Sequence, residues 1–282
     1  MADASPTIRR RELGARLRSL RQAANLTVED VAARMEVSAT KISRLETAAR
    51  GVSIPDVRAL CDIYQVSSED RDRLLALTRE SRRRSWWQQY GLPDSLATYI
   101  GLEDAATSIH QYETSVVPGL LQTEDYARAA TSGALPDATG DAVEHIVSAR
   151  LARQKLLRTE SAPELWVVLD EVALHRIVGS VTTMREQMAA LVERSKHRKV
   201  TVQVVPLDAG AHPGVDSAFE ILHLEDVSDV VHVEGLLGSF FLQSPADLVR
   251  YQRAFDQLRA IALSPRSTRT LLTKFAEGLP SA

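Results

Sequence analysis

Apolar residues in the first 65 positions recur at helical spacing in four segments, the last three of which are introduced by a capping signal. Leu13, Leu17 and Leu20 form one face of a first helix, and Asn25 follows it as a stop signal. A second helix begins at Thr27, where Asp30 completes a capping box, and it turns Val31, Ala32 and Met35 inward. Ser53 caps a fourth helix, whose core face is Val57, Leu60, Cys61 and Tyr64. The pattern predicts a small all-α domain.

The third segment, VSATKISRLETAARG at residues 37–51, has only one apolar stripe, formed by Val37, Ile42 and Leu45. The positions between these apolar residues are small or basic, namely Ser38, Ala39, Thr40, Lys41, Ser43 and Arg44, and Ser38 is a suitable N-cap. A solvated surface helix would show such a face. A helix that lies in a DNA groove would show it too, because short side chains allow close approach and basic ones contact phosphates and base edges.

Two short helices joined by a tight break have helix-turn-helix spacing. Across residues 10–65 the pattern LRxLRxxxxLTxxxVAxxMxVSxxxISRLE resembles the XRE (lambda/434 repressor-like) DNA-binding domains. The sequence departs from that family at Val28, where glutamine is frequent, and at Glu36 and Ala48, where glycine is common. Neither Glu36 nor Ala48 adopts a left-handed conformation as easily as glycine does.

The resemblance implies that residues 38–47 form the recognition helix, with its N-terminal half in the major groove. The implied base-edge contacts are Ala39, Thr40, Lys41 and Arg44. The implied phosphate contacts are Thr27, Ser38, Ser43 and Arg50. Arg21 and Glu46 match a buried ion pair that joins the first and third helices in this family.

The sequence pattern of the rest of the chain predicts both helices and strands. Residues 67–105 contain an amphipathic helix and an aromatic cluster, Trp86, Trp87 and Tyr90, and we interpret them as a helical connector. Strands are expected at 106–114, 164–170, 200–206, 218–224 and 230–234, with helices between the first three, which favours a βαβ unit and an antiparallel pair. The predicted fold class is therefore α+β (mixed): an all-α helix-turn-helix domain at 8–66, the connector, and a mixed α/β domain at 106–282.

This larger part resembles the C-terminal domain of actinobacterial XRE regulators of the WhiJ-like, antitoxin-like group. The likeness is carried by Trp87, Tyr112-Glu113, residues 116–123 (VVPGLLQT), Tyr126-Ala127-Arg128, Arg150–Gln154 and residues 202–206 (VQVVP). It implies a transcription regulator, together with a small partner protein encoded nearby. It supplies no catalytic residues and no cofactor.

Charge separates the two parts. Residues 1–84 contain 17 Lys and Arg against 12 Asp and Glu, a net +5, whereas residues 85–282 contain 17 against 25, a net −8. The basic part suits a polyanionic partner. No stretch reaches the roughly 18 apolar residues of a membrane span, no signal peptide is recognisable at the start, and Cys61 is the single cysteine, so we expect a cytoplasmic protein.

Enzyme motifs are absent from the sequence: there is no GxSxG, HExxH or phosphate-binding glycine loop. His197-Arg198-Lys199 resembles the His-x-Lys of phospholipase D-like folds, but Val204 stands where the aspartate is required. His175, His212, His223 and His232 are scattered, so a shared metal site is conceivable but not expected. We therefore expect neither an enzyme nor a metal site.

The sequence thus predicts a sequence-specific regulator that binds a palindromic double-stranded operator as a homodimer. Its C-terminal domain would receive a ligand or a small protein. The expected working surface is Tyr112, Glu113, Val116, Val117, Leu120, Leu121 and Arg128, presented by the turn at Pro118-Gly119, although burial in the core is the alternative for the apolar members. Two other functions remain open: an interaction protein whose helical domain is only a scaffold, and a DNA-tethered enzyme.

Overall fold

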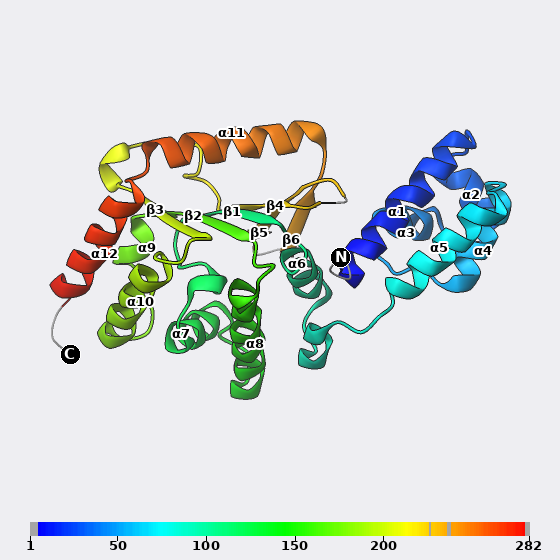
Figure 1. The fold of residues 1–282 in the computed structure, drawn as a ribbon. Coiled ribbons are helices and arrows are strands. Elements are labelled where there is room, and N and C mark those ends of the chain that lie inside the picture. Colours follow the sequence, from blue (N-terminus) through cyan, green and yellow to red (C-terminus); the bar gives the residue numbers. More distant parts are fainter. Residues whose placement is uncertain (1–4, 226, 236–237, 280–282) are drawn as a thin grey trace. The chain divides into compact units, whose positions relative to one another are not determined.

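The computed structural model describes residues 5–225, 227–235 and 238–279. The chain divides between residues 89 and 90 into two units (Figure 1). The sequence predicts a helical domain that ends at residue 66, followed by a connector. The structure differs because Leu74, Leu75 and Leu77 of the connector helix pack into the core of the first unit.

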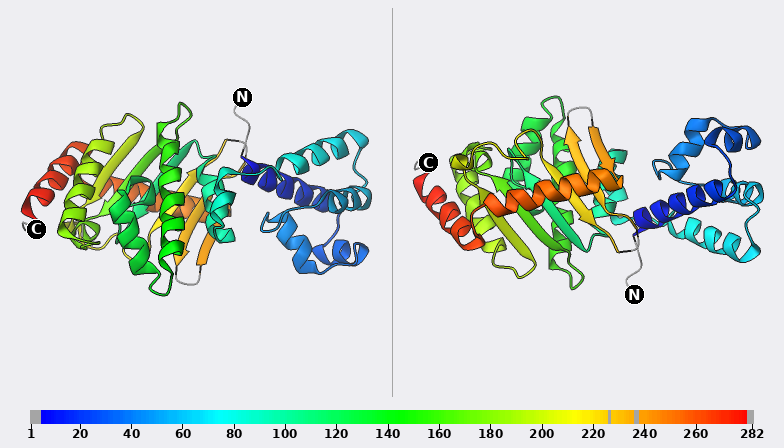
Figure 2. Two further views of the ribbon diagram at one scale, coloured as in Figure 1. Left: turned by 90° about the horizontal axis from the view of Figure 1, so that it is seen from below. Right: turned by 90° about the horizontal axis from the view of Figure 1, so that it is seen from above.

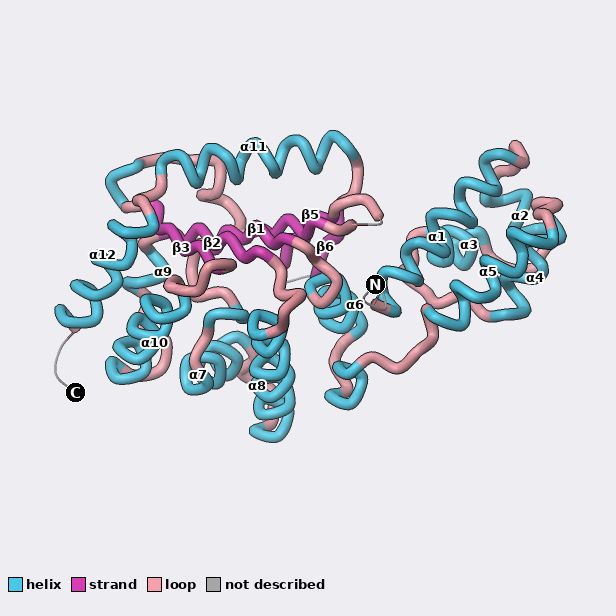
Figure 3. Tube along the Cα trace, viewed as in Figure 1, coloured by secondary structure: helices cyan, strands magenta, loops and turns pink. Residues whose placement is uncertain are grey.

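The described part of the first unit contains helices and loops only (Figure 3). Its helices are α1 (Pro6–Ala23), α2 (Val28–Arg34), α3 (Ala39–Glu46), α4 (Ile54–Ile63) and α5 (Ser68–Glu80), and a 3₁₀ turn, η1 (Trp86–Tyr90), follows them. The predicted capping boxes at Thr27 and Ser53 are confirmed. All the predicted inward-facing residues of these helices contribute to one core.

Four consecutive helices end on a residue in the left-handed conformation, and none of the four is glycine. These residues are Asn25, Glu36, Ala48 and Gln65, with φ of 54°, 55°, 58° and 53°. The sequence singled out Asn25 as a stop signal and Glu36 and Ala48 as positions where glycine is common. The structure shows why: each of them adopts the left-handed conformation that lets the chain change direction after a helix.

The second unit is built on one six-stranded sheet of order β3-β2-β1-β4-β5-β6. The strands are β1 (Ser108–Glu113), β2 (Glu164–Asp170), β3 (Val200–Val205), β4 (Phe219–His223), β5 (Val230–Gly235) and β6 (Gly238–Leu242). β1, β2 and β3 are parallel, whereas β4, β5 and β6 are joined antiparallel to β1 and to one another. The predicted βαβ unit and the antiparallel pair are confirmed, and β6 is an additional strand.

Helices cover both faces of this sheet. α11 (Pro245–Ile261) lies across one face, and α6 (Asp94–Glu103), α7 (Glu124–Ala134), α8 (Gly140–Arg153) and α10 (Val181–Arg194) lie on the other (Figures 1 and 2). The remaining helical segments are α9 (Val172–His175), α12 (Pro265–Gly278), η2 (Gly119–Leu121), η3 (Gln154–Arg158) and η4 (Leu207–Ala209). Under α11 the core includes Tyr112, Phe219 and Phe255. The predicted mixed fold class is confirmed.

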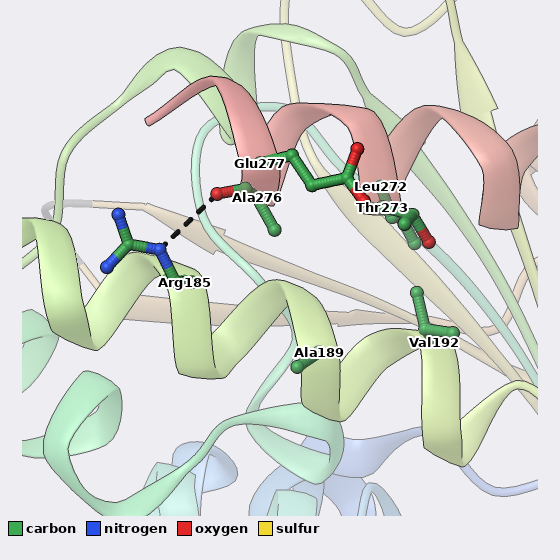
Figure 4. A pocket seen from close by; sticks show the side chains of 7 residues that line it. All are labelled: Arg185, Ala189, Val192, Leu272, Thr273, Ala276 and Glu277. Carbon is green, nitrogen blue, oxygen red and sulfur yellow. Dashed lines mark hydrogen bonds between the residues drawn. The ribbon is translucent and has the colours of Figure 1, made fainter. Parts of the chain in front are cut away.

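α12 packs beside α10, and a shallow hollow of about 410 Å³ remains between the two helices (Figure 4). Apolar side chains, Ala189, Val192 and Leu272 among them, form most of its wall. At one end the Arg185 Nε donates to the Ala276 carbonyl oxygen over 3.4 Å. Among the helices of the described ranges, none is both long and apolar enough to cross a bilayer.

Candidate nucleic-acid interface

α3 is fixed in the first unit by its apolar side. Ile42 and Leu45 are each 1% exposed and pack with Val31 of α2. α1 approaches α3 very closely at Gly14, where a Cβ atom would lie 2.7 Å from the Glu46 carbonyl oxygen. Because no larger residue fits at Gly14, the position of α3 is set by backbone contact as well as by side-chain packing.

Ion pairing between Arg21 and Glu46 reinforces this position. Arg21 Nε and Nη2 donate to the two carboxylate oxygens of Glu46 over 2.7 and 2.9 Å, and Nη1 donates to the Leu26 carbonyl oxygen over 2.8 Å. The hydrogen bond to Glu46 raises the pKa of Arg21 against the opposing effect of burial. This is the pair that the resemblance implies, and it ties α1 to the end of α3.

The opposite side of α3 is polar and open to solvent. Among the predicted base contacts, Thr40 and Arg44 are exposed, whereas Ala39 is half-buried and packs against the core. All the predicted phosphate contacts are exposed, namely Thr27, Ser38, Ser43 and Arg50. Ser38 caps the helix by accepting a hydrogen bond from the Lys41 backbone N–H over 3.2 Å. The structure therefore leaves all these side chains except Ala39 open to solvent, and their DNA contacts stay predictions.

Lys41 is engaged within the protein. Its Nζ lies 2.8 Å from Asp56 Oδ1, and the same carboxylate completes the capping box of α4 through Ser53. Burial acts to raise the pKa of Asp56, but hydrogen bonds from Lys41 and Ser53 outweigh it and hold that pKa below its usual value. Because Asp56 holds the ammonium group of Lys41, Arg44 is the more available cation of α3.

The predicted working surface of the second unit is mostly buried. Tyr112, Val117 and Leu121 are 0% exposed and Leu120 is 2% exposed. The expectation that the turn at Pro118-Gly119 presents these apolar side chains is therefore wrong.

Hydrogen bonds from α10, which is distant from the turn in the sequence, account for the buried position of the turn. The turn forms η2, whose carbonyl oxygens accept from side chains of α10: Gln187 Nε2 donates to the Leu121 oxygen over 2.7 Å, and Arg194 Nη1 donates to the Leu120 oxygen over 3.1 Å. The side chain of Tyr112 lies on the face of the sheet that α11 covers, and its hydroxyl group donates to Asp170 Oδ2 over 3.2 Å. Side chains of α10 thus hold the turn inward.

The other predicted surface residues have different surroundings. Arg128 forms ion pairs with Glu124, Asp125 and Glu144 over 2.8, 3.1 and 2.6 Å. Val116 and Glu113 are half-buried and line a cavity.

Comparison with protein families finds a matching family model for each of the two units. A model described as a helix-turn-helix domain matches residues 12–74, and a model described as a domain of unknown function (DUF5753) matches residues 96–274. The second match covers more than half of the chain. The chain belongs to the DUF5753 family. Comparison with curated proteins and with solved structures finds no match.

The helix-turn-helix model extends into α5, in keeping with the packing of that helix in the first unit. In the DUF5753 domain, no group of three or more His, Cys, Asp or Glu side chains could hold a metal ion, as far as the described residues go.

Glu36 offers a test of the turn between α2 and α3. Because its φ is 55°, replacing it with glycine should relieve strain and stabilise this DUF5753-family protein by about 0.5–1 kcal/mol. The matched control is Ala33→Gly, at an exposed position inside α2, which should destabilise it by about 1 kcal/mol. Calorimetric unfolding of the full chain measures both changes, and a loss of stability in Glu36→Gly would contradict the assigned turn conformation.

Proposed function

We propose that this DUF5753-family protein is a cytoplasmic, sequence-specific DNA-binding transcription regulator that represses or autoregulates its target. The observation that carries the proposal is the exposed polar face of α3, which presents Thr40 and Arg44 while the buried side of the helix is locked to α1 and α2. Recognition helices need this rigidity because base contacts are geometrically demanding. The XRE-type sequence pattern and the likeness to the WhiJ-like, antitoxin-like group support this role.

Each exposed side chain then has a role. Arg44 donates to guanine O6 and N7, and the methyl group of Thr40 meets a thymine methyl. Thr27, Ser38, Ser43 and Arg50 contact phosphates and position the domain without reading sequence. The net positive charge of residues 1–84 adds sequence-independent attraction to the DNA backbone.

A homodimer on a palindromic operator follows from the size of the helix-turn-helix domain. One such domain buries too little surface for a tight, selective site, and related repressors pair on half-sites about one helical turn apart. We assign the DUF5753 domain to dimerisation and to sensing a ligand or a small partner protein. No catalytic role is proposed for it.

Footprinting on the DNA upstream of the gene, combined with light scattering, tests this proposal. We expect a dimer at micromolar concentration and two protected half-sites centred about 10 base pairs apart. The Arg44→Ala variant is the control and should need a higher protein concentration to give the footprint while keeping its helical circular dichroism. A protein that stays monomeric both alone and on DNA, or that protects no site, contradicts the proposal.

A further inference from the structure

Polar side chains form a row across the sheet of the second unit, on the face opposite α11. Gln111 of β1 is paired with Glu220 of β4, and Glu220 is paired with His232 of β5. Glu113 and Glu234 lie two residues further along β1 and β5 and therefore on the same face. Three of these residues, Gln111, Glu220 and His232, are buried, which is unusual in the middle of a covered sheet.

A cavity of about 470 Å³ separates this polar row from the helices α6, α7 and α8. Its size is within the roughly 300–1,000 Å³ of small-molecule sites. Leu96, Val116 and Ile146 contribute apolar wall, opposite the polar row. An apolar wall facing a few convergent polar groups is typical of a binding site for an organic molecule.

Three buried polar atoms that border this cavity make no hydrogen bond within the chain: Thr131 Oγ1, Glu220 Oε2 and His232 Nε2. Their residues are only 4%, 8% and 5% exposed. Glu220 Oε2 lies 3.5 Å from His232 Nδ1, a contact that is an ion pair only when the histidine is protonated. In the described part of the second unit, no other buried side-chain oxygen or nitrogen is unpartnered. Leaving such an atom buried without a hydrogen bond is unfavourable, so the convergence of these atoms on one cavity indicates a site whose partner comes from outside the chain.

The charges around the cavity favour a cation. Arg153 is neutralised by the buried Glu103, to which it donates over 2.8 and 2.6 Å. Arg150 donates to Gln122 Oε1 over 2.6 Å. Three carboxyl groups, those of Glu113, Glu220 and Glu234, line the cavity beside this one remaining guanidinium, and none of the three forms an ion pair with a lysine or arginine of the described chain. The other basic group at the cavity is His232, next to Glu220. The cavity therefore has an excess of carboxylate.

The two inner carboxyl groups are held close together. Gln111 Nε2 donates to Glu113 Oε1 over 2.9 Å and to Glu220 Oε1 over 2.6 Å. Burial, together with the charge of Glu220, raises the pKa of Glu113 to about 8. Glu113 thus holds a proton at neutral pH, where a bound cation would allow it to ionise.

We propose that this cavity binds a small organic cation, an amine or guanidinium compound with an apolar body, whose charged group lies among Glu113, Glu220 and Glu234. The apolar body lies against Leu96, Val116 and Ile146. The inference rests on the proposed sensing role of the second unit and specifies the chemical class of its ligand.

Calorimetric titration of the full chain without DNA tests the site directly. The probes are 2-phenylethylamine, 2-phenylethanol and 3-phenylpropanoate, which share a ring and a two-carbon spacer but are cationic, neutral and anionic. We expect the amine to bind at least about tenfold more tightly than either analogue. Equal binding of the neutral probe, tighter binding of the anion, or no binding of the amine overturns the proposal.

Matched carboxylate variants locate the binding. Glu113→Gln at the inner end and Glu234→Gln at an exposed position should each weaken amine binding about tenfold or more. Glu193→Gln removes an exposed carboxylate that pairs with Lys196 outside the cavity, and it should leave binding unchanged. Because Glu234 is exposed, its variant keeps the test valid even if Glu113→Gln does not fold. Equal losses in all three variants would place the binding elsewhere.

A separate titration of operator DNA with and without the amine distinguishes this inference from the proposed function. Amine binding with no change in operator affinity supports the cavity as a cation site and contradicts the sensing role. Absence of specific DNA binding contradicts the proposed function, while the DNA-free titration still decides the site.

Discussion

Replacing Arg44 with alanine is expected to weaken operator binding by about 1–3 kcal/mol while changing affinity for random DNA much less. Arg44 is the exposed cation on the outer face of α3, and the described chain forms no ion pair with it, so its guanidinium is available for a base pair. Fluorescence anisotropy with operator and random duplexes measures the ratio of the two affinities.

Arg50→Ala is the matched control, because Arg50 is a predicted phosphate contact whose charge attracts DNA without distinguishing bases. It should weaken binding to all sequences alike and reduce the slope of log affinity against log salt by about one unit. An Arg44→Ala variant that behaves in the same way, with an unchanged ratio of operator to random affinity, would show that α3 does not read sequence through Arg44.

Lys41 requires a separate comparison because Asp56 holds its ammonium group. The sequence predicts the same loss of about 1–3 kcal/mol for Lys41→Ala as for Arg44→Ala. If Lys41 leaves Asp56 to contact DNA, then Asp56→Asn should tighten operator binding. If Lys41 stays with Asp56, Lys41→Ala should alter the stability of the first unit and leave the affinity ratio unchanged.

The second large effect is expected in the buried ion pair of the second unit. Arg153→Met should destabilise the protein by about 3–5 kcal/mol, because it leaves Glu103 unpaired at 1% exposure. Burial acts to lower the pKa of Arg153, yet the charge of Glu103 and its hydrogen bonds raise it, so the pair is tightly coupled. Urea unfolding of the full chain measures the loss.

Two controls test whether the loss of stability comes from leaving a buried charge without its partner. The double variant Glu103→Leu/Arg153→Met should recover much of the lost stability, since it leaves no buried charge. Arg128→Met breaks ion pairs at the surface, where solvent screens them, and should reduce stability far less than Arg153→Met does. An Arg153→Met variant as stable as Arg128→Met would contradict the importance of the buried pair.

Local signals in the sequence were sufficient to predict the helices of the first unit. Thr27, Ser38 and Ser53 mark helix starts because their side chains satisfy backbone N–H groups within three residues. The continuous apolar runs at β2 and β3 likewise identify strands covered on both faces. These features depend on neighbouring residues, so the sequence displays them directly.

Contacts between distant segments were less predictable. The turn at Pro118-Gly119 looked exposed, but its burial depends on Gln187 and Arg194, which come from α10. The membership of α5 in the first unit depends in the same way on α1 and α4. A local pattern does not specify which surface meets it from elsewhere in the chain.

The sequence predicts Glu113 and Val116 of the cavity as surface residues, but the signal of three others was not used. Gln111, Glu220 and His232 occupy inward positions of predicted strands, where apolar residues are usual. Their pairing across β1, β4 and β5 follows only from the strand order, which the sequence did not specify.

Selection from a pool of random duplex DNA by the full chain, with Arg44→Ala run in parallel, is the most direct test of sequence reading by α3. We predict that the wild-type protein enriches one palindromic sequence and that the variant loses the preference at the base pair facing residue 44 while retaining the rest of the motif. Enrichment of no sequence by the wild type, or of an identical motif by both proteins, would contradict the assignment of α3 as the recognition helix.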